Sequence, residues 1–140
     1  MLLSEWRGTE THAAALSPKV IAAIEPVLVG LGAAADPDCW IVWGDDPSRF
    51  TVLAPTAAGL ASVHVRVTVP QEGPRAGGKL IRWSHVQVGD FSVETQAGHR
   101  LLGFQVEGQL LRAVDAEVEV LSAFVLRLLA TMDGRPVTGQ

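Results

Sequence analysis

The sequence contains no tyrosine and no asparagine, and it has a single cysteine, Cys39, in 140 residues. A lone cysteine cannot close an internal disulfide, so a small disulfide-stabilised secreted domain is excluded and a cytoplasmic location is expected. The amino terminus carries no basic stretch followed by a long apolar segment, and we predict no secretory signal. The most apolar window, residues 20–35, is too short to span a bilayer and contains Glu25 and Pro26. We therefore expect no membrane helix.

Catalytic and metal-binding motifs are also missing. There is no P-loop, no G-x-S-x-G elbow and no H-E-x-x-H sequence. The histidines, His12, His64, His85 and His99, stand far apart in sequence, and Cys39 has no second cysteine beside it. We predict no metal and no cofactor. An enzyme whose catalytic groups meet only in space would leave no such motif, and the sequence does not decide against one.

Two short segments have catalytic-looking patterns with simpler explanations. Residues 30–35 (GLGAAA) match the glycine spacing of dinucleotide-binding loops, but that fingerprint needs a helix directly after the glycines. Asp36-Pro37-Asp38 and a strand pattern follow instead, so the glycines are interpreted as the end of a helix. Asp45 and Asp46 form an acidic pair before Pro47 and Ser48, where turn capping is favoured over paired catalytic carboxylates.

Two helices are predicted at the ends of the fold. Ser17 before Pro18 is typical of a helix N-terminus, and apolar residues at helical spacing predict a helix over about 18–32. A second helix is predicted over about 116–132, with Asp115 as its N-cap. Its apolar stripe contains Val118, Leu121, Val125, Leu128, Leu129 and Met132, broadened by Phe124 and Leu126. So broad a stripe indicates cover on two sides, by the protein's own sheet and by a second subunit.

Short strands fill the middle of the chain. Residues 39–54 predict a hairpin around a turn at 45–48, and residues 61–69 alternate strictly between valines and polar side chains. Residues 70–78 have the glycine and proline content of a loop. A strand over 79–88 changes phase near Ser84-His85, which predicts a bulge, and Gly89-Asp90 predicts a tight turn into residues 91–95. Two further strands are expected at about 99–106 and 109–114.

These elements predict one α+β domain over residues 1–140. It has an N-terminal helix, an antiparallel meander of about six or seven short strands and a C-terminal helix packed on the sheet. Residues 1–16 are expected to be irregular and residues 134–140 to form a tail. The element order resembles pleckstrin-homology-like domains and also the helix-flanked sheets of bacterial secretion-chaperone-like proteins. A likeness in element order implies no activity.

Charge is distributed unevenly along the chain. Residues 1–48 carry two basic and seven acidic side chains, residues 49–112 carry seven and four, and residues 113–140 carry two and four. The strand region is therefore basic, which can mark a face for an anionic partner, or can attract the acidic helical regions within the fold. The candidate binding face comprises His64, Arg66, Arg82, Trp83, Arg100 and Arg112.

Three functions are compatible with these observations. We expect a non-enzymatic protein-interaction domain, adaptor or chaperone-like, that forms a homodimer and binds another protein through a sheet face or edge. The alternative is single-stranded nucleic-acid binding on the basic face, with Trp83 stacking on bases, although the net charge of −4 opposes strong phosphate binding. The third is an enzyme with a site near residues 73–78, where His64, His85 or His99 would need a carboxylate within hydrogen-bond reach.

Overall fold

The computed structural model describes residues 2–5, 17–46, 48–67 and 71–134. Most of the segment expected to be irregular (6–16), and the tail from residue 135 onward, lie outside these described residues. The predicted α+β class is confirmed, with a helix near the start, antiparallel strands in the middle and a helix at the end. The strands do not form one meander. They form two sheets, and the chain divides into two compact units, Met1–Ile81 and Arg82–Gln140.

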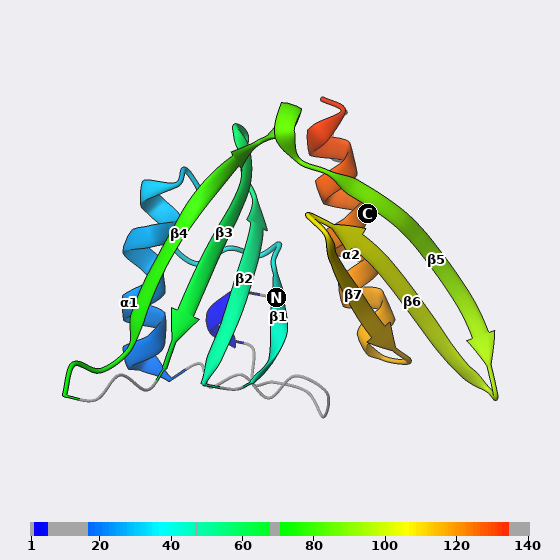
Figure 1. The fold of residues 1–140 in the computed structure, drawn as a ribbon, viewed down its shortest axis with the longest axis horizontal. Coiled ribbons are helices and arrows are strands. Elements are labelled where there is room, and N and C mark those ends of the chain that lie inside the picture. The colour runs from blue at the N-terminus through cyan, green and yellow to red at the C-terminus, as the bar shows by residue number, and fades with distance from the viewer. Residues whose placement is uncertain (1, 6–16, 47, 68–70, 135–140) are drawn as a thin grey trace. The chain divides into compact units, whose positions relative to one another are not determined.

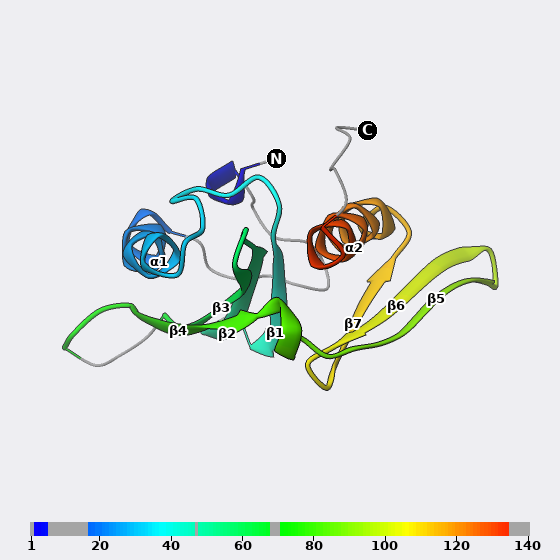
Figure 2. The same cartoon turned by 90° about the horizontal axis from the view of Figure 1, so that it is seen from above.

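The first unit is a four-stranded sheet with one helix on it (Figures 1 and 2). Its elements are η1 (Leu3–Glu5), α1 (Pro18–Gly30), β1 (Ile41–Asp46), β2 (Arg49–Pro55), β3 (Gly59–Arg66) and β4 (Arg75–Arg82). The strands lie in the order β1-β2-β3-β4, and β2 pairs antiparallel with both β1 and β3. The predicted hairpin over residues 39–54 is therefore confirmed as β1 and β2.

Helix α1 begins and ends where local chemistry predicts. The Ser17 side chain accepts a hydrogen bond from the backbone N–H of Val20, and Pro18 occupies the first turn, where its missing N–H leaves no donor unused. The helix ends at Gly30, and Gly32 has a φ of 89°, a conformation that glycine adopts without strain. The glycines of residues 30–35 thus terminate a helix, and no helix follows them.

Apolar residues of α1 and of the sheet form the core of the first unit. Val20, Ile24 and Leu28 on α1 are fully or almost fully buried. The cluster also contains Leu3, Trp40, Val42, Phe50, Val52, Ala54, Val63 and Val65. In β3 the alternation is confirmed from Val63 to Arg66: the valines are buried, and His64 and Arg66 are exposed. Thr68 and Val69 of the predicted strand lie outside the described residues.

The second unit is a three-stranded sheet with one helix. Its elements are η2 (Trp83–His85), β5 (Val88–Gln96), β6 (His99–Val106), β7 (Gln109–Val114) and α2 (Glu117–Met132), and the strands lie in the order β5-β6-β7. Both hairpins turn through two residues with positive φ, Ala97-Gly98 and Glu107-Gly108. This pattern is that of type I′ turns, whose twist matches the strands they join. Helix α2 packs on β6 and β7.

Three local predictions are corrected between residues 70 and 96. Strand β4 begins at Arg75, inside the predicted loop. The phase change near Ser84-His85 marks the 3-10 turn η2, at which the strand ends, and is not a bulge within one strand. At Gly89-Asp90 the chain does not turn: β5 continues through it with a register shift. A Cβ on Gly89 would lie 2.5 Å from a side-chain atom of Gln105 on β6, so the glycine allows this close approach.

The start of α2 also differs from the prediction. The N-cap position is Ala116, without a side-chain hydrogen bond, and Asp115 has left-handed backbone with a φ of 51°. Its carboxylate instead accepts the backbone N–H of Arg100 on β6, so it is committed to the sheet. Phe124 belongs to the buried stripe of α2, whereas Leu126 is 64% exposed. None of the described helices is long and apolar enough to cross a membrane.

Candidate functional site

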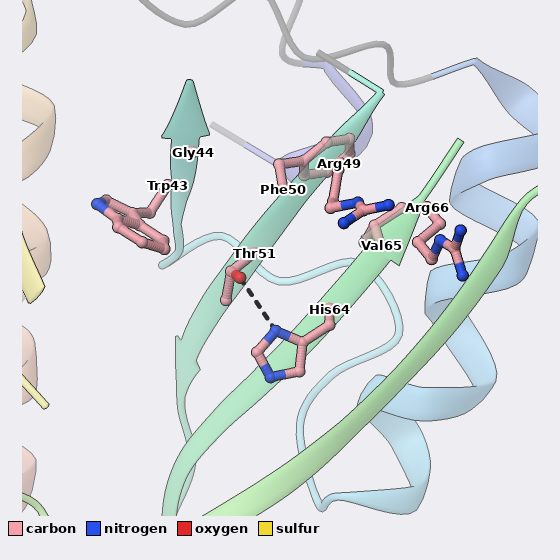
Figure 3. A pocket seen from close by; sticks show the side chains of 8 residues that line it. All are labelled: Trp43, Gly44, Arg49, Phe50, Thr51, His64, Val65 and Arg66. Carbon is pink, nitrogen blue, oxygen red and sulfur yellow. Dashed lines mark hydrogen bonds between the residues drawn. The ribbon is translucent and has the colours of Figure 1, made fainter. Parts of the chain in front are cut away.

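A pocket of about 380 Å³ lies on the first unit, formed by residues of β1, β2 and β3 (Figure 3). Its lining consists of Trp43, Gly44, Arg49, Phe50, Thr51, His64, Val65 and Arg66. Side chains alternate between the two faces of a strand, and the core side of this sheet is marked by Val52 and Val63. Thr51 and His64 are therefore on the face opposite α1. The polar groups of the pocket share that face.

Strand register brings one side chain from each of three strands into a row. Trp43 on β1 lies opposite Thr51 on β2, and Thr51 lies opposite His64 on β3. Side chains of directly opposed residues project from the same face of an antiparallel sheet. The Thr51 hydroxyl oxygen is 3.1 Å from Nδ1 of His64, and this hydrogen bond orients the imidazole ring (Figure 3). An indole, a hydroxyl and an imidazole are thus adjacent across the sheet.

Gly44 shapes the β1 side of the pocket. The pairing of β1 with β2 shifts between Trp43 and Asp46, and Gly44 has a φ of 142°. A Cβ at Gly44 would stand 3.2 Å from Cα of Phe50 and 3.3 Å from the carbonyl oxygen of Arg49. Glycine therefore permits both the backbone conformation and the close approach to β2. Such an irregularity re-aims neighbouring side chains, here beside Trp43.

Two arginines face each other at one end of the pocket. Arg49 on β2 and Arg66 on β3 are direct cross-strand partners, two residues along from the Thr51–His64 pair, and both are exposed. Figure 3 shows their guanidinium groups at the same end of the pocket. Among the side chains that the structure describes, no carboxylate forms an ion pair with either arginine. Arg49 and Arg66 are therefore like charges placed directly opposite each other in the sheet, an arrangement that is unfavourable unless another group compensates it.

The six residues of the predicted binding face do not occupy one site. His64 and Arg66 line the pocket of the first unit. Arg82 is exposed at the N-cap of η2, and Trp83 is half-buried within it. In the second sheet, Arg100 has the same parity on β6 as the buried Leu102. Arg112 alternates on β7 with the buried Leu111 and Ala113, so Arg100 and Arg112 project from opposite faces.

Sequence reasoning identified only His64 and Arg66 of the eight lining residues, and the missed ones include Trp43, Thr51 and Arg49. Trp43 and Thr51 belong to alternating strands in which aromatic and β-branched residues are common, so nothing marks them as binding residues. Arg49 stands alone in sequence, and only the register of the β2–β3 hairpin places it opposite Arg66. That register depends on the turn after Pro55, where the Thr56 hydroxyl accepts the backbone N–H groups of Ala58 and Gly59.

The second unit contains a histidine within hydrogen-bond reach of a carboxylate. Nδ1 of His99 is 2.8 Å from Oδ2 of Asp115, and Oδ1 of Asp115 accepts the backbone N–H of Arg100 at 3.0 Å. Both hydrogen bonds lower the pKa of the Asp115 carboxyl, and the hydrogen bond with His99 has the larger effect. The side chains of His99 and Asp115 are 61% and 50% exposed, so the pair lies open to water. The His99–Asp115 pair links the start of β6 to the residue that follows β7.

The pocket on the first unit combines two arginines, a histidine, a threonine and a tryptophan among its lining residues. Its eight lining residues include no carboxylate and no thiol, so His64 has no acidic partner among them. Within the described parts of the chain, no group of three histidine, cysteine or acidic side chains is arranged to hold a metal ion. No protein-family model, curated protein or solved structure matches this chain.

Proposed function

We propose that this chain is a non-enzymatic protein-interaction domain that forms a homodimer through the free edge of β5. The observation that carries the proposal is the exposure of this strand: residues 89–96 are all exposed, including Phe91 at 49% and Val93 at 56%. An edge strand presents unpaired N–H and C=O groups, and proteins commonly protect such edges with charged residues, proline or a bulge. The segment Val88–Gln96 contains no lysine or proline, and its register shift lies before Phe91.

The apolar side chains of β5 belong to the face that α2 covers elsewhere. Phe91 is opposite Phe104 and Val93 is opposite Leu102, and both of these β6 residues are buried. The Phe91 and Phe104 rings meet edge to face, with centroids 6.2 Å apart. Because α2 packs on β6 and β7, the part of this face on β5 is left uncovered (Figure 1). Covering it would remove apolar surface from water.

The hydrogen-bonding groups of β5 alternate in direction along the strand. In a hairpin closed by a two-residue type I′ turn, the residues flanking the turn, here Gln96 and His99, are hydrogen-bonded to each other. Hydrogen-bonded and non-hydrogen-bonded pairs then alternate along an antiparallel ladder. Phe91, Val93 and Thr95 consequently direct their N–H and C=O groups away from β6, to the free edge. Three residues are thus available for pairing with another strand.

A second copy of β5 fits this edge in antiparallel register centred on Val93. Val93 then faces the second copy's Val93, and Phe91 faces the second copy's Thr95. Asp90 is opposite Gln96 and Glu94 is opposite Ser92, so no like charges meet across the interface. A shift of one pairing step, centred on Ser92, would place Asp90 opposite Glu94, which is unfavourable. Twofold self-pairing is the isologous contact that most homodimers use.

Native mass spectrometry and size-exclusion chromatography with light scattering test the proposal. We expect a dimer for the natural sequence and a monomer for Val93→Lys, because two ammonium groups would face each other at the centre of the interface. Leu110→Lys is the matched control, since Leu110 is also an exposed apolar residue but lies on β7, at the other edge of the sheet. A monomeric natural protein, or a folded Val93→Lys variant that stays dimeric, would contradict the proposal.

Single-stranded nucleic-acid binding on the residues His64, Arg66, Arg82, Trp83, Arg100 and Arg112 has weaker support. Arg100 and Arg112 project from opposite faces of one sheet, and only His64 and Arg66 share a pocket. Binding of this kind requires many phosphate contacts and weakens steeply with added salt. Titration with a short single-stranded oligonucleotide at low and physiological salt tests this alternative, and binding that weakens with added salt would support it.

A further inference from the structure

The arginine pair of the first unit is arranged to hold an oxyanion. Directly opposed residues in an antiparallel sheet have Cβ atoms about 5 Å apart, so the guanidinium groups of Arg49 and Arg66 can converge on one group. Backbone register places Asp46 opposite Arg49 on the other side of β2, and Arg66 is opposite Arg49. An oxyanion between the arginines would offset their repulsion and accept charge-assisted hydrogen bonds from both.

The row of Trp43, Thr51 and His64 beside the arginines supplies a flat aromatic surface and an oriented imidazole ring. Trp43 is half-buried and lines the pocket (Figure 3). Tryptophan is the aromatic side chain with the largest face, and flat ligand rings stack on such a face. His64 is held through Nδ1 by the Thr51 hydroxyl. In the tautomer whose Nδ1 accepts that hydrogen bond, Nε2 carries a proton and can donate it to a ligand.

We propose that this pocket binds a small ligand that combines an oxyanion with a flat ring, of about the size of a mononucleotide. Arg49 and Arg66 hold the oxyanion, Trp43 stacks on the ring, and His64 donates a hydrogen bond between them. The volume of about 380 Å³ falls within the range of pockets that hold small organic molecules. All lining residues belong to the first unit, so this site is independent of dimer formation at β5.

The test uses the full chain and five probes: adenosine 5′-monophosphate, adenosine, inorganic phosphate, benzoate and a short single-stranded oligonucleotide. Binding is followed by isothermal titration calorimetry and by tryptophan fluorescence. We expect the nucleotide to bind at least about tenfold more tightly than adenosine or phosphate, because each of these lacks one half of the ligand. Benzoate distinguishes a carboxylate source from a phosphate source of the oxyanion. Failure of both adenosine 5′-monophosphate and benzoate to bind at millimolar concentration would overturn the proposal.

Substitutions test which residues contact the oxyanion and which contact the ring of the ligand. Arg49→Gln and Arg66→Gln should each weaken nucleotide binding by about tenfold or more, since each removes hydrogen bonds between charged groups. Trp43→Leu should weaken nucleotide binding to a similar extent while leaving binding of inorganic phosphate unchanged. Arg75→Gln removes the same charge from an exposed ion pair with Glu72 in the same unit and should have no effect.

The variants also define the outcomes that contradict the site. An equal loss of affinity in Arg75→Gln would show that overall charge, not the pocket, attracts the nucleotide. Unchanged nucleotide affinity in the Trp43→Leu variant would show that Trp43 does not stack on the ring of the ligand. If the oligonucleotide binds in a way that depends on Arg49 and Arg66 and the mononucleotide does not bind, the ligand of this site is a nucleic-acid strand and not a small molecule. Far-UV circular dichroism of each variant confirms that the sheet is intact.

Discussion

The two sheets of this protein differ in how completely their strands are buried. In the first unit, β2 and β3 are central strands, and only Arg49 on β2 and His64 and Arg66 on β3 are exposed. In the second unit, β5 is an edge strand with eight exposed residues in sequence, although Phe91 and Val93 are apolar. The central strands of the first sheet thus leave cationic side chains at the surface, whereas the edge strand β5 of the second sheet leaves Phe91 and Val93 exposed.

This difference in exposure suits the two sheets to different kinds of binding, one to a small ligand and the other to another strand. Exposed arginines on a well-buried sheet can be held rigidly for a small ligand, because the strands beneath them are fixed by the core. An uncovered apolar edge gains more from pairing with another strand, since both backbone hydrogen bonds and apolar burial become available. The first unit therefore favours ligand binding and the second favours association. Three further sets of substitutions, at the Phe91–Phe104 pair, at Gly78 and at Asp115, test the two units.

The largest effect is expected at the pair of phenylalanines in the second unit. Phe104 is fully buried, and Phe104→Ala should lower the free energy of unfolding by about 3–5 kcal/mol through loss of burial and formation of a cavity. Phe91→Ala removes a ring that is 49% exposed, with an expected cost of about 1 kcal/mol in the monomer. Chemical denaturation followed by circular dichroism measures both, with Phe104→Leu as the milder variant. Equal costs would show that β5 is more covered than the structure indicates.

A smaller effect is expected where β4 passes β3 in the first unit. A Cβ on Gly78 would collide with the carbonyl oxygen of Ser62, whereas a Cβ on Gly77 would meet nothing within 4 Å. Gly78→Ala should therefore lower the free energy of unfolding by about 1–3 kcal/mol, because the backbone of β3 cannot move aside easily. Gly77→Ala is the matched control and should be close to neutral. Equal results in chemical denaturation would mean that β4 is not held closely against β3.

The smallest effect concerns pH and the second unit. The lowered pKa of Asp115 means that its ionised form is favoured by the folded state. Its contribution to stability is therefore fully present above the unfolded pKa of about 3.9 and is lost as the pH falls through the lower folded pKa. Asp115→Asn should be less stable than the natural sequence at pH 6, and the difference should shrink as the pH falls below the unfolded pKa of Asp115. Asparagine tolerates the left-handed backbone at this position, so the substitution isolates the charge.

Hydrogen exchange of the Arg100 amide provides the local measurement for this prediction. That N–H donates to Oδ1 of Asp115, so acidification should lower its protection in the natural sequence. In Asp115→Asn the protection should depend less on pH. A pH dependence that is identical in the two proteins would assign the acid sensitivity to other groups.

Much of the fold could be predicted from local sequence. The cap at Ser17, the alternation from Val63 to Arg66 and the strand breaks near Ala97-Gly98 and Glu107-Gly108 all follow from properties of a few neighbouring residues. Side-chain hydrogen bonding, the two-residue repeat of a strand and the freedom of glycine act over short distances. These predictions needed no knowledge of which strands pair.

The wrong predictions share a different cause. Gly89-Asp90 has the composition of a turn, yet the glycine serves a close approach to Gln105 on β6. Asp115 has the composition of an N-cap, yet its carboxylate bonds to the Arg100 backbone of that same strand. In both cases a partner far away in sequence determines the role of the residue. The same applies to the candidate site, where His64 and Arg66 were identified but Arg49 and Trp43 were not.

The sequence by itself determined the class of the fold, the positions of both helices and most strands, and the basic character of the strand region. Tertiary structure alone decided that the strands form two sheets, that Arg49 faces Arg66 beside Trp43, and that β5 keeps an apolar edge open. The physical reason is the distance along the sequence over which each kind of interaction acts. Helix caps, turns and side-chain alternation depend on neighbours along the chain, whereas register and burial depend on which strands meet in space.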